Sequence, residues 1–157
     1  MKNVSPKIFP VAAATLLAML AAIIGASSVS HVQASPFGDD APHKLVIQMN
    51  KDDKKLQSEI ITNAVNTQKY FGPDDVLVEI VVYGPGIYFL TTDSIFKPRI
   101  ESLMMSGVVF TACAETLHTI ERETGKKLNL IDGVKTVSNG VPHIMELQEK
   151  GYSYLSP

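Results

Sequence analysis

The segment of residues 76–83, VLVEIVVY, constrains the fold more than any other part of the sequence. It is a nearly continuous run of β-branched and apolar residues. A strand with one face in water alternates apolar and polar residues, whereas a continuous apolar run is typical of a strand covered on both faces, as in parallel sheets. The segment therefore predicts a parallel sheet with helices packed on both sides.

The segments around this run alternate between strand-like and helix-like patterns. Further short apolar runs predict strands at 44–49, 108–112, 134–137 and 152–155. Apolar residues at helical spacing predict helices at 52–71, 94–106, 114–123 and 142–150. The order βαβαβαβαβ predicts an α/β fold with a mostly parallel five-stranded sheet and right-handed crossovers.

The first 34 residues differ from the rest of the chain. Lys2 and Lys7 precede an apolar stretch at 8–25, and small or polar residues without an acidic one follow up to Ala34. This order is typical of a secretory signal peptide, so we predict a signal peptide at 1–34, a flexible segment at 35–43 and one α/β domain at 44–157. An uncleaved membrane anchor is the alternative, because about 18 mostly apolar residues approach the length that spans a bilayer.

Cleavage after Ala34 would leave 123 of the 157 residues, enough for one domain with a sizeable core. It would also leave 12 of the 14 basic residues against 16 acidic ones, a net charge of −4. This charge argues against binding to nucleic acid. We expect a periplasmic or secreted protein that contacts a membrane only if the signal segment is retained.

Cys113 is the only cysteine, and it stands where the run 108–112 meets the helical pattern 114–123. The free N–H groups and dipole at a helix N-terminus can lower a thiol pKa, which indicates a reactive thiol. The alternative is a small buried hydrophobic residue. Ligands of open parallel sheets bind beyond the carboxyl ends of the strands, where Cys113, the loop 83–86 and the turn at Asn50 are expected to meet.

Several segments together resemble the DsrE/DsrF-like sulfur-relay proteins over almost the whole domain. They are KLVIQ at 44–48, VYGPG at 82–86, GVVFTAC at 107–113 and LQEKGYSY at 147–154. The resemblance implies a flavodoxin-like three-layer sandwich, assembly into homotrimers or homohexamers, and a cysteine that carries sulfane sulfur as a persulfide. Cys113 occupies the matching position, and this chemistry requires no metal or organic cofactor.

The sequence thus predicts an exported sulfur carrier or sulfurtransferase that uses a small sulfur donor and a thiol acceptor protein. Cys113 is the predicted catalytic residue. The predicted substrate-binding residues are Gly84 and Gly86, whose N–H groups can face an anion such as thiosulfate, together with Thr116 and Asn50. The alternative is a non-catalytic oligomeric binding module with a structural cysteine.

Other residues bear on the reactivity of Cys113, on metal binding and on oligomerisation. Glu115 replaces an asparagine that is frequent in the family, and its carboxylate either raises the thiol pKa or interacts with the helix dipole. His118 is too far around the helix to face Cys113 well, and the remaining histidines lack the spacing of a zinc site. The apolar run 87–90 is one that a small domain is not expected to bury alone, which favours oligomerisation.

Overall fold

The computed structural model describes residues 41–157. The predicted signal peptide, its cleavage site and residues 35–40 of the predicted flexible segment lie outside the described residues. In the described part of the chain, none of the helices has the length and apolar character needed to span a membrane.

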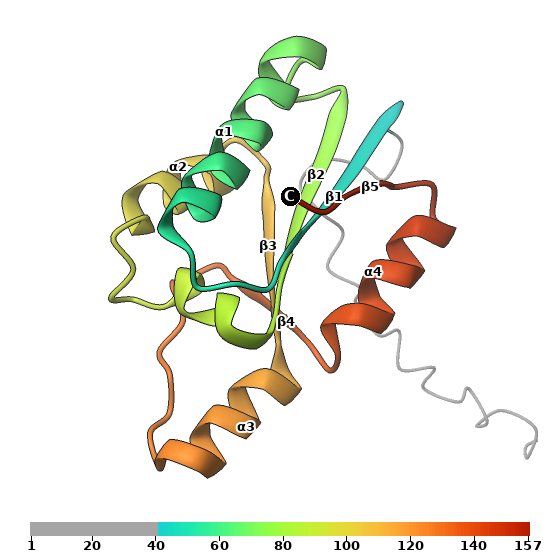
Figure 1. Cartoon of the computed structure of the whole chain (residues 1–157). Coiled ribbons are helices and arrows are strands. Elements are labelled where there is room, and N and C mark those ends of the chain that lie inside the picture. Colours follow the sequence, from blue (N-terminus) through green and yellow to red (C-terminus); the bar gives the residue numbers. More distant parts are fainter. Residues whose placement is uncertain (1–40) are drawn as a thin grey trace, which may run out of the picture. The chain divides into compact units, whose positions relative to one another are not determined.

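The domain is built on five parallel strands (Figure 1). They are β1 (His43–Met49), β2 (Val76–Val82), β3 (Val109–Cys113), β4 (Lys135–Val137) and β5 (Ser153–Leu155). Their order across the sheet is β4-β3-β2-β1-β5, with every neighbouring pair parallel. The predicted flavodoxin-like three-layer α/β sandwich is confirmed. The domain resembles flavodoxin in its three layers and its parallel strands. The strand order differs, because flavodoxin has the order 2-1-3-4-5.

Helices cover both faces of this sheet. They are α1 (Lys54–Phe71), the 3-10 helix η1 (Gly84–Leu90), α2 (Lys97–Met105), α3 (Ala114–Thr124) and α4 (Gly140–Glu149). α1 and α2 lie on one face and α4 on the other, while α3 projects beyond the carboxyl end of β3 (Figure 1). α2 begins three residues later than predicted, and Pro98 occupies its first turn, where the missing N–H costs nothing.

The two faces of the sheet have separate cores. The larger core joins the sheet to α1, η1 and α2, and its fully buried side chains include Ile47, Ile60, Ile80, Phe89 and Phe110. The smaller core joins Val46 and Val81 to Ile144 and Leu147 of α4. Every residue of β2 is buried, which confirms that the apolar run 76–82 is covered from both sides.

The run 87–90 does not need a neighbouring subunit for burial. Ile87, Phe89 and Leu90 are at most 1% exposed inside the domain, and only Tyr88 is partly open to solvent. The expectation that one domain cannot bury this run is therefore wrong. The 3-10 turn of η1 explains the difference, because it directs three of the four side chains into the larger core.

A buried polar cluster links the start of α4 to the sheet. The hydroxyl of Thr111 donates to Oε1 of Glu79 at 2.6 Å, and Nε2 of His143 lies 2.7 Å from the same oxygen. The hydrogen bond with Glu79 raises the pKa of His143, although burial opposes it; the charges of Glu79 and Glu146 also raise it and that of Lys150 lowers it. This cluster fixes the first turn of α4 over β2 and β3.

Candidate functional site

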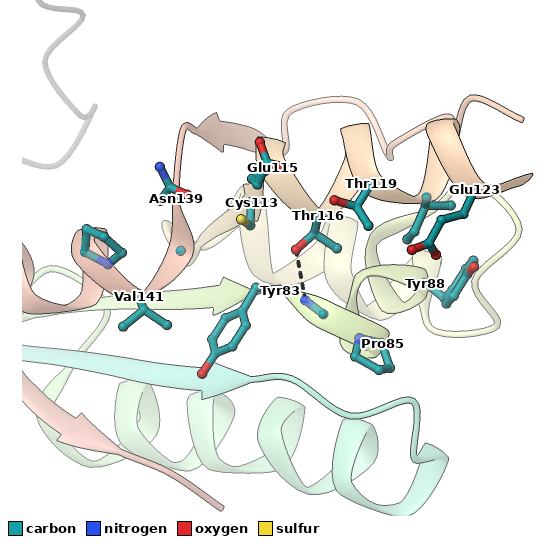
Figure 2. A pocket seen from close by; sticks show the side chains of 14 residues that line it. Tyr83, Pro85, Tyr88, Cys113, Glu115, Thr116, Thr119, Glu123, Asn139 and Val141 are labelled. Carbon is teal, nitrogen blue, oxygen red and sulfur yellow. Dashed lines mark hydrogen bonds between the residues drawn. The ribbon is translucent and has the colours of Figure 1, made fainter. Parts of the chain in front are cut away.

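Cys113 ends β3 and is the N-cap residue of α3. The residue is only 6% exposed, and it lines a cavity of about 480 Å³ at the carboxyl edge of the sheet (Figure 2). Its thiol donates to the carbonyl oxygen of Ser138 at 3.9 Å. The cysteine is therefore buried by the protein on one side and faces a cavity on the other.

The first turns of two helices, α3 and α4, lie against Cys113. Burial raises the pKa of the thiol, but hydrogen bonds from the Thr116 hydroxyl and from the backbone N–H groups of Thr116, Gly140 and Glu115 lower it. The net effect is a pKa below the ordinary value. Thr116 and Glu115 belong to the first turn of α3, and Gly140 is the first residue of α4. N–H groups at helix starts have no intrahelical partner, so those of Thr116 and Gly140 are available to stabilise a thiolate, whereas the Glu115 N–H also donates to the Ser138 carbonyl oxygen at 3.2 Å.

Thr116 connects the sulfur to the loop after β2. Its Oγ1 accepts a hydrogen bond from the Gly84 N–H at 3.0 Å (Figure 2). The hydroxyl proton is then free to point at Cys113. Gly84 consequently uses its N–H within the protein, instead of presenting it to an anion as the sequence had suggested.

Two of the five predicted site residues lie outside the cavity lining. Gly86 packs on the β1 end, where an added Cβ would be 2.8 Å from the Met49 carbonyl oxygen. The Asn50 side chain hydrogen-bonds to Tyr83, whose own pKa is raised by burial and by Tyr154 and lowered by this bond. The structure thus brings Cys113, Gly84 and Thr116 together and gives Gly86 and Asn50 supporting positions.

Gly140 is a site residue that the sequence analysis missed. A Cβ at this position would be 3.2 Å from Cβ of Tyr83 and 3.4 Å from Cβ of Cys113. The absence of a side chain lets α4 begin this close to Cys113 without a shift of Tyr83 or of Cys113. The available signal was Asn139-Gly140, two residues after the predicted strand 134–137, at the same edge of the sheet as Cys113.

The nearby charged or titratable side chains of Glu115 and His118 form no hydrogen bond or ion pair with the Cys113 sulfur. The Glu115 carboxylate pairs with Arg122 at 3.4 Å, with both side chains more than half exposed. His118 is exposed. No histidine of the described residues lines the cavity, and no group of three or more His, Cys, Asp or Glu residues between 41 and 157 is placed to hold a metal ion. The pKa of Cys113 is therefore lowered by hydrogen bonds and not by a neighbouring cation.

We expect Thr116→Val to slow the reaction of Cys113 with iodoacetamide at pH 7 by about five- to tenfold. A hydrogen bond to an ionised group contributes about 1.5–3 kcal/mol, and part of the lost thiolate is offset by higher intrinsic nucleophilicity. Thr116→Ser retains the hydroxyl and should react within about twofold of wild type. Thr119→Val, one turn further along the same wall, is the matched control. An unchanged midpoint in the pH–rate profile of Thr116→Val would show that the Thr116 hydroxyl does not lower the pKa of Cys113.

The sequence matches no protein-family model, and no curated protein matches it. Among solved structures, the domain is similar to MTH1491, a protein of unknown function from Methanobacterium thermoautotrophicum, with a TM-score of 0.66 and 30% identity. The match covers 73% of this chain and 99% of MTH1491. The chain belongs to the MTH1491 family.

A second solved structure shares the fold of the MTH1491 family. BT1422, a conserved protein of unknown function from Bacteroides thetaiotaomicron, has a TM-score of 0.53 and 20% identity, over 73% of this chain and 94% of its own. Both matched proteins are of unknown function, so the matches indicate no activity for this chain. A shared fold alone does not indicate one either, because function is set by the residues of a site. The resemblance to sulfur-relay proteins remains a prediction.

Proposed function

We propose that Cys113 accepts sulfane sulfur, holds it as a persulfide and passes it to the thiol of an acceptor protein. The observation that supports this proposal is the position of Cys113 at the start of α3, where it lines a cavity of about 480 Å³, large enough for a small molecule. The thiol pKa there is raised by burial but lowered overall by donors from Thr116, Gly140 and Glu115. These donors favour a thiolate, which is the nucleophilic form of cysteine.

The transfer is balanced without an external oxidant or reductant. The Cys113 thiolate attacks the outer sulfur of a donor such as thiosulfate, a new S–S bond forms, the old S–S bond breaks, and sulfite leaves with the electron pair. An acceptor thiolate then attacks the outer sulfur of the persulfide, and Cys113 leaves as a thiolate. A lowered pKa helps this second step, because a more acidic thiol is a better leaving group.

The export and assembly of the protein belong to the same proposal. A periplasmic or secreted carrier would meet its sulfur donor outside the cytoplasm, and a homotrimer or homohexamer would present several such cysteines. Light scattering distinguishes that assembly from a monomer, and blotting of the secreted fraction for a shortened chain tests cleavage of residues 1–34.

We expect mass spectrometry of the intact protein, after treatment with polysulfide, thiosulfate or an alkyl hydropersulfide, to show a gain of one or more sulfur atoms. The adduct must lie on Cys113, since it is the only cysteine. Cys113→Ser is the control and should show no gain. The absence of an adduct with every donor, in protein whose Cys113 still reacts with an alkylating reagent, would overturn the proposal.

The low exposure of Cys113, 6%, favours a second candidate: a binding module with a structural cysteine. The two candidates differ in the rate of alkylation of the native protein. A structural thiol reacts much more slowly than a free thiol at neutral pH, whereas an activated thiolate that faces a cavity reacts at least as fast.

A further inference from the structure

The cavity next to Cys113 has two chemically different ends. One end holds the sulfur and the helix starts beside it, and the wall from there is formed by successive turns of α3 that carry Thr116, Ile120 and Glu123. Figure 2 shows Thr116 and Glu123 at the two ends of this wall. Tyr88 of η1 also lines the end at Glu123 (Figure 2). The complete lining is Tyr83, Gly84, Pro85, Tyr88, Cys113, Glu115, Thr116, Thr119, Ile120, Glu123, Asn139, Gly140, Val141 and Pro142.

None of these lining residues is Lys, Arg or His, and two of them are glutamates. Arg122 lies beside the rim, where it contacts the Glu115 carboxylate at 3.4 Å and the Thr119 hydroxyl at 2.9 Å. The charge of Arg122 therefore offsets that of Glu115, and Glu123 leaves the far end of the cavity with a net negative charge. The remaining side chains of the lining are apolar or uncharged.

The direction of sulfur transfer determines which part of a donor meets this far end. Displacement at sulfur runs in line, so the leaving group points away from Cys113 and into the cavity. Cys113 and Glu123 are ten residues apart on one helix, roughly 15 Å along its axis. The Glu123 side chain leans back toward the start of the helix, which shortens this span. A leaving group of several atoms would thus contact Ile120 and Tyr88 and approach the Glu123 carboxylate.

We propose that the cavity selects an organic sulfur donor without negative charge, namely a persulfide R–S–SH with an apolar, neutral or cationic R group, over inorganic anions. The inference rests on the proposed sulfur transfer. The Cys113 thiolate attacks the outer sulfur, the S–S bond to R–S breaks, R–S⁻ leaves with the electron pair, and the proton stays on the transferred sulfur. The donors at the sulfur end stabilise the one anionic sulfur, and the rest of the cavity receives the R group.

Symmetric disulfides with different end groups test the charge preference independently of sulfur transfer. Mixed-disulfide formation at Cys113 is measured with bis(aminoethyl), bis(hydroxyethyl) and bis(carboxyethyl) disulfide, and each rate is divided by that of N-acetylcysteine with the same reagent. We expect the cationic reagent to react fastest and the anionic one slowest, with a spread of about tenfold for charges 4–5 Å from Glu123 in water-like surroundings. Equal rates, or a faster anionic reagent, would overturn the inference.

Two variants test whether the charge preference among the disulfides arises from Glu123 in the cavity. Glu123→Gln should reduce the spread to about threefold, since it removes the carboxylate at the far end. Glu121→Gln, on the same helix but outside the lining, should retain the full spread. Loss of the spread in Glu121→Gln, or no change in Glu123→Gln, would contradict the role of the cavity.

Persulfide formation separates this inference from the proposed function. Alkyl hydropersulfides with the same three end groups are compared with thiosulfate by mass spectrometry. Faster transfer from the neutral and cationic compounds supports the inference. Equally fast transfer from thiosulfate overturns it and leaves the sulfur-carrier function standing. If no donor yields a persulfide while the disulfide series retains its order, the proposed function fails and the charge selectivity of the cavity survives.

Discussion

Gly140→Val is expected to slow the alkylation of Cys113 at pH 7 by tenfold or more, because two effects act together. A Cβ at this position would lie 3.2 Å from Tyr83 and 3.4 Å from Cys113, and the branched valine adds two further carbons. The start of α4 must then move away, and the Gly140 N–H loses its hydrogen bond to the sulfur. The thiol pKa should rise as a result.

The pH dependence of the alkylation rate distinguishes a raised pKa from a blocked cavity. A raised pKa moves the midpoint of the pH–rate profile upward, whereas steric obstruction lowers the plateau at high pH. Gly140→Ala should give a smaller change in the same direction, since its single methyl group requires a shift of only a few tenths of an ångström. Val141→Ala, at the adjacent lining position, is the matched control. If the Gly140→Val protein folds and the midpoint of its pH–rate profile equals that of wild type, Gly140 does not lower the pKa of Cys113.

Glu79→Ala is expected to lower the free energy of unfolding by about 3 kcal/mol. Glu79 is 8% exposed, and its carboxylate accepts hydrogen bonds from Thr111, which is fully buried, and from His143. Its removal leaves the buried Thr111 hydroxyl and the partly buried His143 ring without their acceptor. Urea unfolding measures the loss, and Glu101→Ala is the control, because Glu101 makes only an exposed ion pair with Lys97 and should change stability by less than about 1 kcal/mol.

Stability should also depend on pH through His143. Its pKa is raised in the folded protein by the hydrogen bond with Glu79, and the other charged groups that act on it are Glu146 of α4 and Lys150, which caps that helix. The stabilisation is therefore complete below the unfolded pKa of about 6.5, and it is lost as the pH rises through the higher folded pKa. The difference in unfolding free energy between wild type and His143→Gln should be largest near pH 5.5 and shrink toward pH 8. A difference that does not vary with pH would contradict the pairing.

The fold was largely predictable because its elements have regular patterns. The continuous apolar run of β2 required cover on both faces, and the 3.6-residue spacing in α1 and α3 identified helices to within a few residues. The run 87–90 was misread because a 3-10 turn has neither periodicity. Its burial depends on how the loop returns onto the larger core, which no local pattern encodes.

The site was predictable in part, and for a different reason. The position of Cys113 at a strand end and helix start follows from the chain itself, and so does the donor Thr116 three residues later. Gly140 reaches the sulfur only because β4 pairs with β3, with Val137 beside Cys113. The contact of Glu79 with His143 joins residues 64 positions apart. Such contacts depend on strand pairing and helix packing, so sequence spacing alone does not reveal them.

Because Gly140 lies next to Cys113, the reactivity of this single cysteine can be used to follow folding. The α3 donors follow Cys113 directly in the chain, but the Gly140 N–H arrives only after the last crossover has carried α4 onto Val46 and Val81 and β5 onto β1. The acidity of the thiol is therefore complete only when α4 and β5 have docked on the sheet. The rate at which Cys113 reacts during refolding reports when that last segment closes onto the sheet.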